Sequence, residues 1–205
     1  MRKAFRKPYY AYFYGMMRSV AVFCGSSRGF DPEYSSQAEK LGQLLAQRNI
    51  TLVFGGSKVG LMEDLSDSAL QAGGKVIGVM PRLLYDKGIG HTGLSEMIVV
   101  ETMHERKLRM NELCEGIIAL PGGFGTLDEC FEMITWVQLG IHQKPVALLN
   151  VKGFYDSLAQ MITHMTAQGF LKEVHRDMLI ISHCMEEILQ KMEDYTAPTE
   201  GKWIR

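Results

Sequence analysis

The chain has 205 residues, 46% of them hydrophobic, and this length and composition suit a single soluble globular domain. Its 22 basic and 23 acidic residues nearly cancel, so the overall charge gives no indication of binding to nucleic acid or to an anionic membrane. No apolar run in the sequence approaches the ~20 residues that a membrane-spanning helix requires. Any phosphate chemistry must therefore come from a local site.

The four cysteines do not form a recognisable framework. Cys24, Cys114, Cys130 and Cys184 are widely spaced, and no two of them have the C-x-x-C spacing of a zinc or redox site. This pattern predicts free thiols, most of them small buried hydrophobes, in a reducing compartment such as the cytoplasm. We expect no metal site.

The first seventeen residues differ from the rest of the chain. Residues 1–17 carry four basic residues and no acidic one, and the first acid is Asp31. A transit peptide has such a composition, but we favour a disordered or loosely docked extension that results from a start upstream of Met17. We predict one domain over residues 18–195, preceded by this extension and followed by a tail at 196–205.

From Arg18 onward, short apolar runs alternate with segments of helical periodicity. The runs, typical of buried parallel strands, lie at 18–24, 51–54, 75–80, 97–100, 116–120, 145–149 and 178–182. Helices are predicted at 33–48, 60–73, 103–114, 127–139, 154–168 and 184–193. Residues 82–95 contain three glycines and no periodicity, so we expect a loop there.

This alternation predicts an α/β fold with a parallel sheet covered by helices on both faces. Ligands of such sheets bind outside the carboxyl ends of the strands. Glycine clusters follow three of the predicted strands, at Gly25, at Gly55–Gly56 and at Gly122–Gly125. We therefore expect these clusters to converge on a single ligand cleft.

The segment Pro121–Glu129, PGGFGTLDE, is the first candidate site. Gly122, Gly123 and Gly125 allow a ligand to approach the backbone closely, and the helix that follows offers free amides to an anion. The segment is neither a Walker A loop nor G-x-G-x-x-G, so by itself it only favours phosphate binding. A structural alternative exists, since Thr126-x-x-Glu129 also matches a capping box.

Clustered carboxylates beside a phosphate require a cation, and Met103–Lys107, MHERK, offers one. Arg106 and Lys107 at the start of a helix oppose its dipole, which favours a functional reason for them. The alternative is a solvated polar face with helical pairs such as Glu105–Arg109. Met103 is a candidate for stacking on a base, whereas the other methionines are expected to fill the core.

The two remaining glycine turns leave their roles open. Gly55 and Gly56 serve either a tight connection or contact with ribose or phosphate, and Ser26 is a candidate phosphate ligand. Ser27 is expected to cap the following helix. Three histidines are expected on the surface: His142, His164 and His175.

PGGFGTLDE with the upstream MHERK resembles the LONELY GUY family of cytokinin-activating phosphoribohydrolases, whose members are often labelled lysine decarboxylase-like. The resemblance runs from about Arg18 to Phe170 and includes CGSS (24–27), GGSKVGLM (55–62), ITWVQLGIHQKPVALLN (134–150) and GFYDSL (153–158). It implies a Rossmann-like doubly wound sheet in a single domain and a homodimer. There are departures: Ser57 replaces a common glycine, Glu63 replaces another, and Leu83 stands where plant members usually have an acid.

By this resemblance Arg106 and Glu129 are the catalytic pair, and the nucleotide contacts are Lys107, residues 123–129 and Thr135. The implied reaction is hydrolysis of the N-glycosidic bond of AMP or an N6-modified AMP, giving free base and ribose 5-phosphate. Glu129 would stabilise oxocarbenium character on the ribose, and Arg106 would hold either the phosphate or Glu129. No cofactor is required.

Two alternatives remain. One is a general AMP nucleosidase, and the other is a non-catalytic nucleotide-binding regulator. The decarboxylase label is unsupported, because that reaction needs pyridoxal phosphate on a Schiff-base lysine, and no segment of the chain clearly provides one.

Overall fold

The computed structural model describes residues 17–198. Seven strands form one sheet: β1 (Ser19–Phe23), β2 (Thr51–Phe54), β3 (Val76–Pro81), β4 (Glu96–Val100), β5 (Gly116–Ala119), β6 (Val146–Leu149) and β7 (Leu179–Ser182). Their order is β4-β3-β2-β1-β5-β6-β7, and every pairing is parallel. The predicted α/β class and the doubly wound parallel sheet are confirmed.

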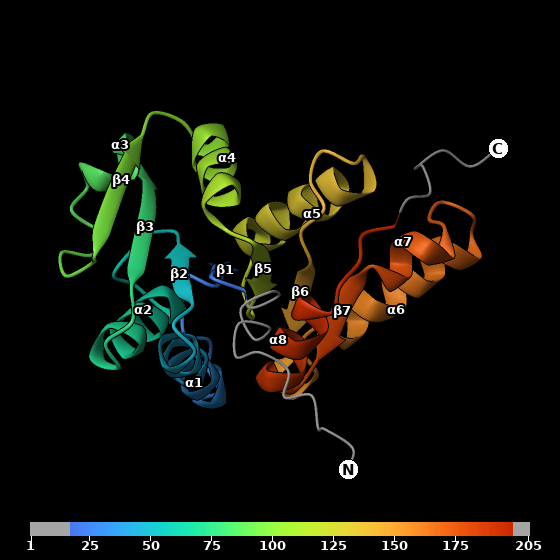
Figure 1. Ribbon diagram of the computed structural model, residues 1–205, viewed down its shortest axis with the longest axis horizontal. Coiled ribbons are helices and arrows are strands. Elements are labelled where there is room, and N and C mark those ends of the chain that lie inside the picture. The colour runs from blue at the N-terminus through green and yellow to red at the C-terminus, as the bar shows by residue number, and fades with distance from the viewer. Residues whose placement is uncertain (1–16, 199–205) are drawn as a thin grey trace, which may run out of the picture.

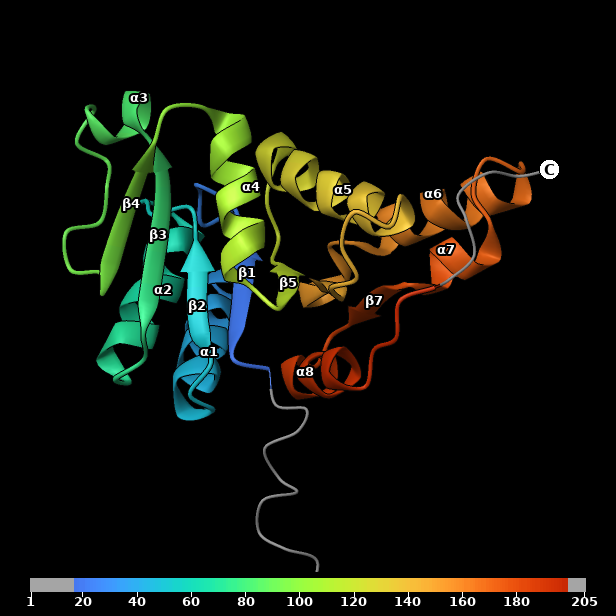
Figure 2. The ribbon, with the colours of Figure 1, turned by 45° about the horizontal axis from the view of Figure 1, so that its top comes forward.

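Helices cover both faces of this sheet (Figures 1 and 2). They are α1 (Glu33–Gln47), α2 (Leu61–Gln71), α3 (Arg82–Tyr85), α4 (Met103–Leu113), α5 (Phe124–Gln138), α6 (Asp156–Ala167), α7 (Glu173–Asp177) and α8 (Met185–Glu193), with a short 3-10 turn, η2 (Val151–Gly153). Figure 1 shows α1 and α2 together on one side of the strands and α4 and α5 on the other.

The core is divided accordingly into two apolar layers. One layer packs α1, α2 and α8 against the sheet through residues such as Leu41, Leu65 and Ile188. The other packs α4 and α5 through Met110 and Met133. Strands β1, β3 and β5 inside the sheet are buried on both faces, which explains why their sequences are continuous apolar runs rather than alternating ones.

The chain reverses its direction of travel across the sheet at β1. Strands β2, β3 and β4 extend to one side of β1, whereas β5, β6 and β7 extend to the other. The loops after β1 and β5 therefore diverge to opposite faces and leave a crevice between them, which is where sheets of this type bind ligands. The first turn after β1 and the glycine-rich segment after β5 lie at this point.

Several sequence predictions were wrong in detail. A short helix, α3, interrupts the loop expected at 82–95, and α7 was not predicted, because helices of four or five residues carry no periodic signal. His142 and His175 are buried rather than exposed, at 9% and 2% exposure, whereas His164 is exposed as predicted. Burial, which disfavours the charged imidazolium, lowers the pKa of His142 to about 4.

The described cysteines are all free thiols, and three of them are buried as expected, but Cys184 is exposed. Cys184 immediately precedes α8, and this place at a helix start puts it at the surface. Met17 is buried in the core, one residue before the predicted domain start. The prediction for the N-terminal extension otherwise falls on residues 1–16, outside the described part of the chain. Between residues 17 and 198 no helix is long and apolar enough to span a membrane.

Candidate active site

The three glycine turns meet at the carboxyl edge of the sheet, as predicted. The Gly25 amide donates to the Pro121 carbonyl at 3.0 Å, and the Leu61 amide donates to the Gly25 carbonyl at 3.1 Å. These bonds tie the loop after β1 to the loops that lead into α5 and α2. A cavity of about 290 Å³ opens between them. Its lining includes three predicted site residues, namely Ser26, Gly122 and Gly123.

Two of the glycines are required by close approach. A methyl carbon on Gly122 would lie 2.1 Å from the Thr126 hydroxyl oxygen and 2.9 Å from the Gly25 amide nitrogen. One on Gly55 would lie 2.2 Å from a terminal nitrogen of Arg106. Gly55 thus makes room for a guanidinium, so its role is to admit Arg106 rather than only to close a tight turn.

Arg106 and Glu129 form a buried ion pair. Arg106 lies in the first turn of α4 and Glu129 in the second turn of α5, and the Nη1 group of Arg106 donates to Oε1 of Glu129. The Nε group of Arg106 donates to the Val79 carbonyl at 3.1 Å. Both side chains are largely shielded from water, at 10% and 8% exposure. The fold therefore brings the two predicted catalytic residues into direct contact.

This environment controls the ionisation of Glu129. Burial raises the pKa of the carboxyl above its ordinary value of 4.5, while the Arg106 guanidinium opposes that rise. The thiol of Cys24 lies close by: burial raises its pKa most, the Glu129 carboxylate raises it further, and Arg106 lowers it. Cys24 is therefore a neutral, apolar group in the floor of the site.

Lys107 points to the other side of α5. Its ammonium lies 3.1 Å from Asp128 and 2.8 Å from Glu132, and its side chain is 7% exposed. The expectation of a solvated polar face at the start of α4 is thus wrong for Arg106 and Lys107. The two cations bind carboxylates of α5 instead, and so join the two helices that border the site.

The N-terminus of α4 is stabilised by a capping box of its own. The Thr102 side chain accepts from the Glu105 amide at 3.1 Å, and the Glu105 carboxylate accepts from the Thr102 amide at 3.3 Å. Glu105 is therefore not available for the Glu105–Arg109 pair that we considered, and Arg109 binds Glu112 at 2.9 Å. This cap offsets the cost of placing cations in the first turn.

The capping-box alternative for Thr126 and Glu129 is wrong. Helix α5 begins at Phe124, after Gly123 and without a side-chain cap, because the glycine backbone itself turns into the helix. Thr126 is buried against Gly122, and Glu129 is committed to Arg106. Ser27 does not cap α1 either; its hydroxyl accepts from the Gly29 amide at 3.3 Å.

The uncapped start of α5 leaves backbone amides for a ligand. Gly123 and Gly125 are exposed, and no atom lies within 4 Å of the place where a side chain would begin on either. Free amides at a helix N-terminus, together with the positive end of its dipole, suit a phosphate group. Met103 is 45% exposed. Gly56 adopts φ +74°, which favours glycine there.

Thr135 lies away from the glycine-bordered cavity, on the side of α5 where Lys107 binds Asp128 and Glu132. It borders an open groove along the outer face of α5, together with Phe124, Leu127, Phe131 and Trp136, and it does not line the glycine-bordered cavity. It follows Glu129 by six residues, which at 100° per residue turns it to another side of the helix. Of the predicted residues, Ser26, Gly122 and Gly123 line the cavity, Arg106 and Glu129 form the buried pair with Gly55 against Arg106, and Lys107 and Thr135 lie on another side of α5.

Sequence reasoning missed five residues that line the cavity: Arg28, Gly29, Tyr34, Leu61 and Phe154. Tyr34 and Phe154 pack edge to face, with ring centroids 5.9 Å apart. Phe154 lies in a segment already noted for its resemblance, but nothing in its own pattern points to a ligand. In the described residues no three histidine, cysteine, aspartate or glutamate side chains are grouped so as to hold a metal ion.

Comparison with known proteins places these features in a family. A family profile described as "Possible lysine decarboxylase" matches residues 62–192. The chain is 45% identical over 184 residues to the cytokinin riboside 5′-monophosphate phosphoribohydrolase LOG5 of Arabidopsis thaliana, covering 90% of this chain and 81% of that protein. It is 44% identical over 182 residues to the probable phosphoribohydrolase LOGL1 of Oryza sativa subsp. japonica, covering 89% and 82%.

Solved structures share the fold at lower identity. A molybdenum cofactor binding protein from Rippkaea orientalis matches with a TM-score of 0.63 and 24% identity, covering 84% of this chain and 96% of that chain. The molybdenum cofactor carrier protein of Chlamydomonas reinhardtii matches with a TM-score of 0.60 and 18% identity, covering 86% and 96%. The likeness extends to the fold alone, whereas the sequence similarity to the plant proteins covers the paired helices of the site. This chain belongs to the LONELY GUY (LOG) family of cytokinin riboside 5′-monophosphate phosphoribohydrolases.

Proposed function

We propose that this protein hydrolyses the N-glycosidic bond of a nucleoside 5′-monophosphate, releasing the free base and ribose 5-phosphate. Adenine nucleotides, with or without an N6 substituent, are the proposed substrates, because the relatives are named for cytokinin riboside 5′-monophosphates. The observation that carries the proposal is the buried Arg106–Glu129 pair, beside exposed glycine amides that suit a phosphate.

Glu129 supplies the charge that the transition state needs. As the base leaves, C1′ of the ribose gains positive charge, and a carboxylate near that atom stabilises it. Water then adds to C1′: its hydroxyl group stays on the ribose, and its proton balances the departing base. The bonds that Arg106 makes to Glu129 and to the Val79 carbonyl support a role in holding this carboxylate rather than the phosphate.

The start of α5 is therefore the proposed binding place of the phosphate. The open amides of Gly123 and Gly125 are available to it, and Lys107 offsets the acidic groups of the same helix. Binding a remote group in this way positions the reacting sugar. Hydrolysis of this kind needs no electron carrier or covalent cofactor.

A non-catalytic nucleotide binder is the second candidate, and the site disfavours it. A protein that only binds a monophosphate gains little from burying Glu129 close to an anionic ligand, where like charges repel. A carboxylate at this place stabilises positive charge that develops on the ribose, in addition to joining α4 to α5 through Arg106. A general AMP nucleosidase remains a variant of the same chemistry, distinguished by its base.

Base release from isopentenyl-AMP, AMP and the nucleoside adenosine tests the proposal. We expect release of base from the monophosphates, measured by chromatography, and little from adenosine, which lacks the phosphate. Faster turnover of isopentenyl-AMP identifies cytokinin activation, and equal or faster turnover of AMP identifies a general nucleosidase. Binding of AMP without release of adenine would refute the hydrolase and leave the binder.

We also propose that the protein is a homodimer that works in the cytoplasm. Large apolar side chains are exposed on α5 and just beyond it, with Phe124 at 95%, Leu139 at 47% and Ile141 at 61% exposure. A second copy covering this surface would explain why Thr135 lies outside the cavity of its own chain. Light scattering should give a mass of two chains for the wild type, and Phe124→Ser should shift the measured mass toward that of one chain. The free thiols fit a reducing compartment.

A further inference from the structure

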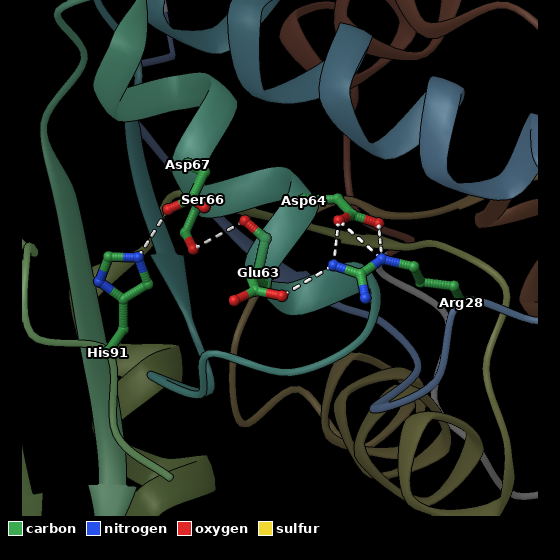
Figure 3. A network of polar contacts seen from close by, with 6 residues as sticks. All are labelled: Arg28, Glu63, Asp64, Ser66, Asp67 and His91. Carbon is green, nitrogen blue, oxygen red and sulfur yellow. Dashed lines mark hydrogen bonds and ion pairs between the residues drawn. The ribbon is translucent and has the colours of Figure 1, made fainter.

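Arg28 joins the rim of the cavity to helix α2. It lines the cavity together with Gly122 and Gly123. Its guanidinium donates to Asp64 through Nε at 3.0 Å and Nη2 at 2.7 Å, and Nη2 also donates to Glu63 at 2.7 Å (Figure 3). Figure 3 shows one arginine side chain spanning two neighbouring carboxylates at the start of the helix.

The loop that carries Arg28 is packed tightly against α2. A methyl carbon on Gly60 would lie 2.3 Å from the backbone of Ser26 and 2.4 Å from that of Ser27. At the other end of the loop, Asp31 forms an ion pair with Lys152. The backbone that carries Arg28 therefore has little freedom to move, and the guanidinium stays close to the two carboxylates.

Arg28 compensates part of the negative charge of two carboxylates that lie close together on α2. The Asp64 side chain is 9% exposed, and Glu63 is 35% exposed. Asp64 is linked to the cavity through Arg28, which binds Asp64 and also lines the cavity. Arg28 lines the same cavity as Gly123, so two uncompensated carboxylates at its position would repel an anionic ligand in that cavity. Glu63 and Asp64 alone carry a charge of −2, and with Arg28 the net charge of the cluster is −1.

Glu63 and Asp64 together hold both edges of the Arg28 guanidinium. A side chain bound on both edges keeps its charge beside the two carboxylates.

We propose that Arg28 is a positioning residue that acts through Asp64 and Glu63: it compensates their charge and so allows a nucleoside monophosphate to bind. This inference rests on the proposed function for the identity of its ligand. It extends the site to the β1–α1 loop and to the carboxylates at the start of α2.

Steady-state hydrolysis of AMP by the full chain tests it. Arg28→Gln should raise KM about fivefold at an ionic strength of about 20 mM, with kcat within about twofold, and about 500 mM salt should largely erase the effect. Adding Asp64→Asn to Arg28→Gln removes the uncompensated charge without restoring any bond. The double variant should therefore return KM to within about twofold of the wild-type value.

Arg18→Gln is the matched control. Arg18 also binds a carboxylate, Glu115, at 2.6 Å, but it precedes β1 and so lies at the opposite edge of the sheet from the cleft. KM should not change in this variant. If Arg28→Gln fails to fold, Asp64→Asn alone serves instead. It should leave KM equal to or below the wild-type value, because Arg28 then faces one carboxylate, and a higher KM would contradict the proposal.

Two results would overturn the inference. One is an unchanged KM for folded Arg28→Gln at low salt. The other is a double variant whose KM stays as high as that of Arg28→Gln, which would mean that bonds and not charge matter. Wild-type protein that releases no base defeats the proposed function separately. The same variants are then compared by the Kd for AMP from calorimetry, with the same expected ratios.

Discussion

Replacement of Glu129 by glutamine probes the reaction most directly. The change keeps the shape of the side chain and removes its charge, while the amide oxygen can still accept a hydrogen bond from Arg106. Conversion of a buried charge-assisted contact to a neutral acceptor costs about 2 kcal/mol of unfolding free energy. That is a fraction of the ~5–15 kcal/mol of a typical domain, so the variant should fold.

The effect on catalysis should be far larger than the effect on stability. Loss of the carboxylate removes the group that stabilises charge at C1′, and we expect kcat for adenine release to fall at least about a hundredfold. Thermal unfolding, followed by circular dichroism, verifies that the variant is folded. Its affinity for AMP should be retained, because the phosphate is held by backbone amides rather than by Glu129.

Glu112→Gln is the matched control for that experiment. Glu112 lies on α4 and also binds an arginine, at 2.9 Å, but its side chain is 50% exposed. The activity of the Glu112→Gln variant should equal that of the wild type. A folded Glu129→Gln protein with activity within about threefold of the wild type would refute the reasoning, since a catalytic carboxylate is worth far more than that.

Three further predictions follow from the same geometry. Because burial raises the pKa of Glu129 and the reaction needs its ionised form, kcat should fall as the pH is lowered through a value above 4.5, and a pH–rate profile measures this limb. Gly122→Ala should lower the unfolding free energy by roughly 1–3 kcal/mol, because its methyl group would lie 2.1 Å from the Thr126 hydroxyl, whereas Gly123→Ala should unfold like the wild type and raise only KM. The pKa of His142 is lowered to about 4 from 6.5, so the unfolded chain binds more protons between these values and stability is lost as the pH falls from 6.5 to 4. His142→Gln should reduce that loss by up to about 3 kcal/mol in urea titrations, and an equal pH dependence in both proteins would contradict the assignment.

Local patterns were sufficient for the layout of the fold. Continuous apolar runs such as 51–54 and 116–120 are buried strands, and the periodic apolar positions of 33–48 form the buried face of α1. These patterns reflect burial on one or both faces, which leaves a direct signature in sequence. Short elements such as α3 leave none, and the start of α5 was misplaced because it has no capping side chain.

The chemistry of the site was visible in the sequence as residue types but not as contacts. The glycine turns, Arg106 and Glu129 were recognisable from composition, position and resemblance. Their pairing joins residues 23 apart in the chain, and Arg28 meets α2 across 35 and 36 residues. Nothing in either local pattern specifies such contacts, because they depend on how the helices pack on the sheet.

Backbone freedom and hydrophobic periodicity are local properties, so the residue pattern alone predicts an α/β chain with glycine turns at the strand ends. The packing of the helices on the sheet controls which charges are buried together, and therefore which carboxylate is prepared for catalysis. Burial and charge proximity depend on groups distant in the chain. That is why a helix cap remained an alternative for Glu129 until the fold placed its side chain against Arg106.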